Sequence, residues 1–103
     1  MAFQEAQKKV DEWIQLHKIG YWKPHEILAR IMEEVGEFAK EVNHDFGPKK
    51  RKINDTSNVK DELGDILFSL CCYANAHGIS LDECFQTAMD KCYTRDKDRF
   101  EKK

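Results

Sequence analysis

Two pairs of carboxylates stand at matching positions in the middle of the chain. Glu34 and Glu37 are three residues apart, and so are Glu62 and Asp65. On a helix this spacing puts both members of a pair on one side, one turn apart, with about 5–6 Å between Cβ atoms. The hydrophobic periodicity places each pair beside the apolar stripe of its helix. If the two helices pack antiparallel, the four carboxylates converge in one groove.

Four converging carboxylates require a cation. Two unit charges about 4 Å apart repel by roughly 4 kcal/mol at an effective dielectric near 20, a large part of a small domain's stability. Ligation by carboxylate oxygens favours Mg²⁺, with Mn²⁺ as a substitute. Histidine is absent from both motifs, which disfavours a carboxylate-bridged di-iron protein. A divalent-metal site is one interpretation of the pattern, and two solvated acidic helix faces are the other.

Each pair also contains a glycine one residue before its second carboxylate, Gly36 in the first and Gly64 in the second. Glycine inside a helix costs about 1 kcal/mol relative to alanine. Two glycines in matching positions therefore predict the close approach of a helix or a ligand.

Apolar residues recur at three- and four-residue steps, which predicts an all-α fold. The expected helices cover 3–18, 24–45, 56–77 and a fourth segment from residue 80. Pro24 suits the first position of the second helix, and one of residues 56–58 caps the third. Ser80 and Glu83 have the spacing of a capping box. Short connections between these helices imply an antiparallel four-helix bundle.

The third helix is apolar on nearly all sides between Ile66 and Ala76, and Phe68 lies opposite the stripe of Leu63 and Leu70. A helix that is apolar all round must be buried all round. One layer of four helices cannot cover it. We therefore expect a bundle completed by homo-oligomerisation, as a homodimer or homotetramer.

Length and charge limit the other function classes. The 103 residues form one domain, 1–103. A formal net charge of −2 gives no general case for a nucleic-acid partner, and the basic run 49–52 is interpreted as a solvated loop. No window approaches the roughly 18 apolar residues of a membrane span, and the N-terminus has no apolar signal core. We expect a cytoplasmic protein without a nucleic-acid or membrane partner.

The four cysteines contain no C-x-x-C pair and include two adjacent residues; they are Cys71, Cys72, Cys84 and Cys92. Adjacent cysteines rarely ligate one zinc, and a helical domain of this size does not need disulfides. We expect all four to be reduced and most of them to act as small packing residues.

Two segments together resemble the E-E-x-x-E … E-x-x-D signature of the MazG-like, all-α nucleoside triphosphate pyrophosphohydrolases. They read Glu33-Glu34-Val35-Gly36-Glu37 and Glu62-Leu63-Gly64-Asp65-Ile66-Leu67-Phe68. The resemblance extends over essentially the whole chain. It implies an enzyme whose Mg²⁺ ligands are Glu34, Glu37, Glu62 and Asp65.

The resemblance also implies the reaction. Water attacks the α-phosphorus of a nucleoside triphosphate, pyrophosphate leaves, and Mg²⁺ neutralises the developing charge. One carboxylate would take the proton from the water, and Glu33 and Glu37 are the catalytic candidates. Glu33 matches the leading glutamate of the signature but points away from the apolar stripe, so a solvated surface residue is the alternative.

Three further residues are candidates for substrate binding. Lys91 and Arg95 match basic residues that the family places against the phosphates, although some members carry Asn where Tyr93 stands. Cations near a helix C-terminus are also favoured by the helix dipole alone. Trp22, just before the second helix, is positioned to stack on a base or to pack, whereas Trp13 belongs to the expected core.

Two other functions remain compatible with these residues. One is a related pyrophosphohydrolase specific for phosphoribosyl-ATP or for deoxynucleotides, which would share the carboxylate pairs. The other is a non-catalytic metal-binding interaction domain, which the intact set of four carboxylates disfavours. The base and sugar preference and the number of metal ions stay open.

Overall fold

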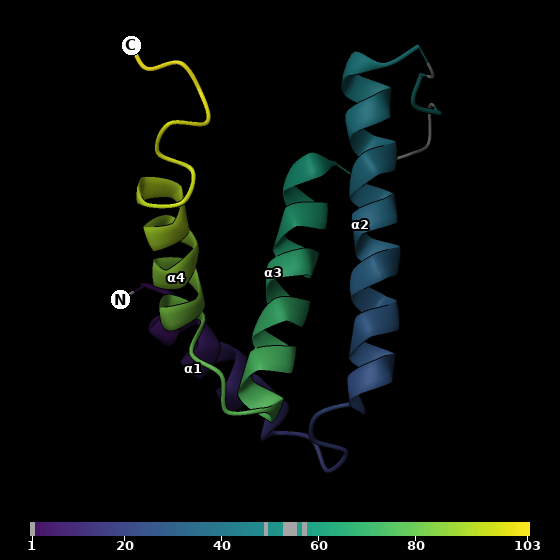
Figure 1. The fold of residues 1–103 in the computed structure, drawn as a ribbon. Coiled ribbons are helices and arrows are strands. Elements are labelled where there is room, and N and C mark those ends of the chain that lie inside the picture. The colour runs from purple at the N-terminus through teal and green to yellow at the C-terminus, as the bar shows by residue number, and fades with distance from the viewer. Residues whose placement is uncertain (1, 49, 53–55, 57) are drawn as a thin grey trace.

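Four amphipathic segments of the chain form α-helices in the computed structural model, which describes residues 2–48, 50–52, 56 and 58–103. Within these residues there is no strand (Figure 1). The helices are α1 (Ala2–Ile14), α2 (Pro24–Phe46), α3 (Val59–Ala76) and α4 (Leu81–Tyr93). The predicted all-α, four-helix fold is confirmed. None of the described helices combines the length and hydropathy needed to cross a lipid bilayer.

The starts of the helices follow the predicted capping residues closely. Pro24 is the first residue of α2, and Ser80 Oγ accepts a 3.2 Å hydrogen bond from the Glu83 backbone N–H at the start of α4. Asn58 caps α3, because its Oδ1 accepts from the Asp61 N–H at 3.0 Å. The helix therefore begins at Val59, three residues later than the earliest predicted start; residue 57, another predicted cap, lies outside the described residues.

The end of α1 differs from the prediction, which extended this helix to residue 18. After Ile14 the backbone changes to tighter i→i−3 hydrogen bonds, from Leu16 N to Trp13 O and from His17 N to Ile14 O. Gly20 then adopts a φ of 65°, which only glycine tolerates easily. Trp13 is 51% exposed, so the prediction that it lies in the core is wrong; its ring packs edge-on against Phe68 instead.

The helices are arranged as an antiparallel pair with two further helices at one end. In Figure 1, α2 and α3 stand side by side and run in opposite directions. Helix α1 packs across α3, and α4 packs mainly on α1, so α4 stands apart from α2. The long seam between α2 and α3 is the part of the fold that positions the acidic residues.

The buried core is small and lies where α1, α2 and α3 meet. It consists of Ile14, Ile27 and Cys72, with partly buried apolar side chains around them. Cys71 and Cys72 are buried as predicted, but Cys84 and Cys92 are exposed, which corrects the expectation that most cysteines pack. All four are free thiols.

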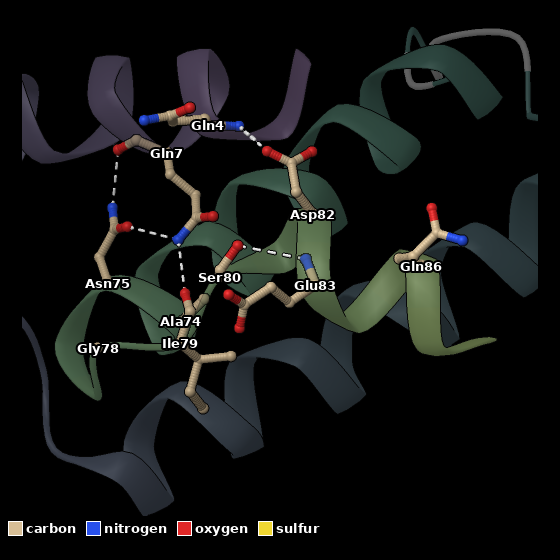
Figure 2. Close-up of a pocket in the computed structure, with 10 residues that line it drawn as sticks. All are labelled: Gln4, Gln7, Ala74, Asn75, Gly78, Ile79, Ser80, Asp82, Glu83 and Gln86. Carbon is tan, nitrogen blue, oxygen red and sulfur yellow. Dashed lines mark hydrogen bonds between the residues drawn. The ribbon is translucent and has the colours of Figure 1, made fainter. Parts of the chain in front are cut away.

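One glutamine links α1 to the turn between α3 and α4, beside a hollow of about 710 Å³ (Figure 2). Gln7 Nε2 donates to Asn75 Oδ1 and to the Ile79 carbonyl, each at 2.9 Å. Its Oε1 accepts from the Leu81 N–H at 2.9 Å, and Asn75 Nδ2 donates to the Gln7 carbonyl at 2.8 Å. Gln7 therefore holds the first turn of α4 against α1.

Large apolar side chains on α2, α3 and α4 remain exposed on the side where α4 stands apart. We call this surface the apolar face; its residues are Leu28, Met32, Val35, Leu63, Leu67, Leu70 and Phe85. The α2 and α3 members recur with helical spacing. Two hollows, of about 490 and 560 Å³, lie between some of these residues and α4. The radius of gyration is 17.0 Å, against about 13 Å for a compact domain of this length.

Replacing Gln7 with alanine should destabilise the protein by about 1–3 kcal/mol, because three polar partners lose their hydrogen bonds, two of them in partly buried positions. The matched control is Gln86→Ala, since Gln86 lines the same hollow but bonds only along its own helix, to Asp90. Urea unfolding of both variants measures the difference. Equal stability of the two variants would show that the Gln7 hydrogen bonds do not contribute to the free energy of unfolding.

Candidate functional site

Five carboxylates line the seam between α2 and α3, and we call them the carboxylate row. Helix α2 contributes Glu34, Glu37 and Glu41, and α3 contributes Glu62 and Asp65. Glu34, Glu41 and Glu62 are 5%, 1% and 6% exposed, whereas Glu37 and Asp65 are exposed. Because the helices run antiparallel, Glu41 lies at the level of Glu62 at one end, and Glu34 lies at the level of Ser69 at the other.

The centre of the row is formed by Glu37, Glu62 and Asp65. Burial raises the pKa of Glu62 to about 7, and a hydrogen bond to Glu37 and the charges of Glu37, Asp65 and Glu41 act in the same direction. Glu62 Oε2 is buried and has no hydrogen-bond partner among the described residues. Within that part of the chain, none of these three side chains forms a salt bridge. The centre therefore carries excess negative charge.

The end of the row at Glu34 is neutralised by the chain itself. Ser69 Oγ donates to Glu34 Oε1 at 2.6 Å, and Arg30 Nε lies 3.5 Å from Glu34 Oε2. The structure thus brings three of the four predicted ligands together and holds the fourth, Glu34, one step along the seam.

The other end of the row is neutralised by the loop after α2. Arg51 Nη2 donates to the buried Glu41 Oε2 and lies 3.3 Å from Asp45 Oδ1. His44 Nδ1 lies 3.7 Å from Glu41 Oε1. Sequence reasoning missed Glu41, although its spacing of four residues from Glu37 places it on the same helix face.

The interpretation of the basic run 49–52 as a solvated loop is wrong for one of its residues. Arg51 is half-buried and paired with two carboxylates, whereas Lys50 and Lys52 are exposed as expected and residue 49 lies outside the described residues. The buried charge of Glu41 needs a partner, and Arg51 in the following loop supplies it. No signal in the run itself separates Arg51 from its neighbours.

The donor set of the centre suits a hard divalent cation, because it consists only of carboxylate oxygens and includes one buried oxygen without a partner. The oxygens do not already converge on one point: among the described residues, no group of three or more His, Cys, Asp or Glu side chains is arranged to hold a metal ion. A Cβ built on Gly36 or Gly64 would meet no described atom within 4 Å, so the described residues show no close helix approach at these glycines.

Trp22, in the connector before α2, and Glu33, on α2, line the same hollow, and Trp22 also packs against the buried core. With Arg30, they line a hollow of about 370 Å³. The Arg30 guanidinium stacks over the Trp22 ring, 4.9 Å from its centroid, while its Nε contacts Glu34. Arg30 therefore connects the hollow that contains Trp22 and Glu33 to Glu34, a member of the carboxylate row.

Lys91 and Arg95 are not brought to the row within one chain. Both are exposed at the C-terminal end of α4, which Figure 1 shows separated from α2 and α3. Arg95 is paired with Asp96, from Nε to Oδ1 and from Nη2 to Oδ2, each at 3.0 Å.

Comparisons with known proteins show the family to which the chain belongs. Residues 23–100 match the model of the MazG nucleotide pyrophosphohydrolase domain. The chain is 45% identical over 103 residues to the uncharacterised protein YpjD of Bacillus subtilis strain 168, covering 99% of this chain and 93% of YpjD.

Two crystal structures are similar to this fold. One is YpjD from Bacillus subtilis, with a TM-score of 0.78 at 41% identity over 86% of this chain and 92% of that chain. The other is the Bacillus-conserved MazG protein, a nucleotide pyrophosphohydrolase, with a TM-score of 0.79 at 41% identity over 93% and 94%. The chain therefore belongs to the MazG nucleotide pyrophosphohydrolase family, all-α hydrolases that act on pyrophosphate bonds.

Proposed function

We propose that this protein hydrolyses a nucleoside triphosphate to the nucleoside monophosphate and pyrophosphate, with Mg²⁺ at the centre of the carboxylate row. The observation that carries the proposal is the charge pattern of the row. Arg30 and Arg51 neutralise its two ends, while the centre keeps a buried carboxylate oxygen without a partner. Burial is the main cause of the raised pKa of Glu62, and repulsion by neighbouring carboxylates adds to it; a cation there would relieve this repulsion.

Glu37, Glu62 and Asp65 would hold the cation, with Glu34 completing the set from the adjacent turn of α2. When bound, Mg²⁺, or Mn²⁺ in its place, would neutralise charge on the triphosphate as it reacts. Glu33 and Glu37 remain the candidates for taking the proton from the attacking water. Glu33 is exposed beside the Trp22 hollow, whereas Glu37 already bonds to Glu62.

The hollow lined by Trp22 and Glu33 is the proposed place for the base. Its wall is aromatic, and a nucleobase stacks favourably on an indole ring. Arg30 covers one face of that ring in this structure, so the base would stack on the part of the ring that the guanidinium leaves uncovered.

We propose a homodimer or homotetramer that covers the apolar face with a second copy of the chain. A folded monomer of 12.1 kDa exposes about 6,000 Å² on the usual scaling with mass, whereas this chain exposes 8443 Å². The excess exceeds the roughly 800 Å² per partner of a standard interface. A second copy would also offer Lys91 and Arg95 to the phosphates, which one chain does not bring to its own row.

Two exposed thiols without disulfide partners, Cys84 and Cys92, are compatible with a reducing compartment. We therefore propose the cytoplasm as the location of this reaction.

The reaction is tested by measuring pyrophosphate release with Mg²⁺ from a panel of ribo- and deoxynucleoside triphosphates, damaged bases and phosphoribosyl-ATP. We expect release with the monophosphate as co-product, loss of turnover with a chelator, and its return with Mg²⁺ or Mn²⁺. Turnover that persists without a divalent cation would contradict the role of the metal. Mg²⁺ binding without release from any substrate would favour the non-catalytic interaction domain.

Glu37→Gln should lower kcat by at least about 100-fold, because it removes a charged oxygen that serves the cation and the proton transfer. The fold should persist, since Glu37 is exposed. Glu12→Gln is the matched control, because Glu12 is an exposed glutamate on α1. Wild-type turnover by Glu37→Gln would show that the assigned site is wrong.

Leu67→Glu should convert the oligomer to a monomer, since it places a charge in the middle of the apolar face, where Leu67 is 54% exposed. Leu16→Glu introduces the same charge at a leucine outside that face and should leave the assembly intact. Light scattering at micromolar concentration measures both masses. A monomeric wild-type protein would rule out the proposed assembly.

A further inference from the structure

Ser69 is a buried serine beside the carboxylate row that takes no part in the proposed reaction. It lies on α3 four residues after Asp65, on the same face of the helix, and is 1% exposed. Its hydroxyl donates across the seam to Glu34 Oε1 at 2.6 Å. That distance is at the short end for an O–H···O hydrogen bond and is typical of a bond to a charged acceptor.

Arg30 acts on the other oxygen of the same carboxylate. Its Nε lies 3.5 Å from Glu34 Oε2, from one helical turn earlier on α2. The guanidinium is itself fixed by the Trp22 ring beneath it. Glu34 is therefore held at both oxygens, by a group from the facing helix and by a group from its own helix.

This double hold leaves acceptor positions on Glu34 for a cation. A carboxylate has about four acceptor sites, two on each oxygen, and Ser69 uses one of them. Buried carboxylates that ligate metals are commonly oriented by a second hydrogen-bonding partner, and removing that partner typically weakens metal binding by 10- to 100-fold.

We propose that Ser69 and Arg30 are positioning residues for the metal site: they hold the Glu34 carboxylate in one orientation so that the cation meets a ligand already ordered. The inference rests on the proposed cation site at the carboxylate row. It assigns a specific task to a buried hydroxyl within the apolar stretch 66–74 of α3, where alanine would fill nearly the same space without a polar group.

The test measures Mn²⁺ binding to the full chain without substrate, by electron paramagnetic resonance of the free ion. Ser69→Ala should raise the Mn²⁺ dissociation constant about tenfold, and Arg30→Gln should raise it in the same direction. Ser80→Ala removes a serine hydroxyl that caps α4 instead, so it lowers stability without touching the row. Its dissociation constant should stay within about twofold of wild type.

Two results would overturn the inference, and they are distinguishable. If the wild type binds Mn²⁺ and a folded Ser69→Ala variant binds it equally well, the positioning role is wrong while the metal site stands. If the wild type binds no Mn²⁺, the proposed cation site fails and the inference fails with it. As a second readout, the Mg²⁺ concentration for half-maximal turnover should rise in Ser69→Ala, while kcat at saturating Mg²⁺ changes by less than about threefold.

Discussion

Packing α2 antiparallel against α3 creates an electrostatic constraint on which the rest of the structure depends. The seam between these helices holds five carboxylates, three of them buried. Arg30 and Arg51 neutralise the two ends, one from within α2 and one from the loop that follows it. The centre keeps its charge. The pKa of Glu62 is raised there, mainly by burial and further by the neighbouring carboxylates. The family acts on pyrophosphate bonds, so its substrates are polyanions, and the cation that we propose at this centre would neutralise part of their charge.

Helices α2 and α3 also carry most of the apolar face, which α4 leaves exposed. Gln7 holds the start of α4 against α1, so α4 does not cover the leucines of α2 and α3. One chain therefore buries only a small core, and its exposed area is larger than that of a compact monomer. A second copy placed on the apolar face would complete the core and bring the basic end of a neighbouring α4 within the same assembly.

Local signals in the sequence predicted the elements well and their surroundings less well. Helix starts depend on one or two residues, such as Pro24 and Ser80, and these were predicted correctly. The end of α1 depends on a change to i→i−3 bonding after Ile14, which no single residue announces. Leucine stripes show that a face is apolar, but whether it packs within one chain or between two depends on the direction of α4.

In the candidate site, too, local sequence signals predicted some residues, while contacts between distant segments determined the roles of others. The i, i+3 spacing and the family signature predicted Glu37, Glu62 and Asp65 as site residues, and the structure places their charges close enough to act on one another. The roles of Ser69 and Arg51 arise from contacts between segments distant in the chain, so their types and local spacing gave no sign of them. From the sequence alone, Ser69 is a small residue in an apolar stretch of α3, and Arg51 is one cation in a basic loop. Their roles become visible only when the carboxylate that each one faces is known.

The central claim is that the open centre of the carboxylate row holds a divalent cation. Its most direct test is an anomalous difference map from crystals grown with Mn²⁺. We expect a peak in contact with carboxylate oxygens of Glu37, Glu62 and Asp65, with Glu34 as the fourth ligand. A peak at another location, or no peak at saturating Mn²⁺, would contradict it.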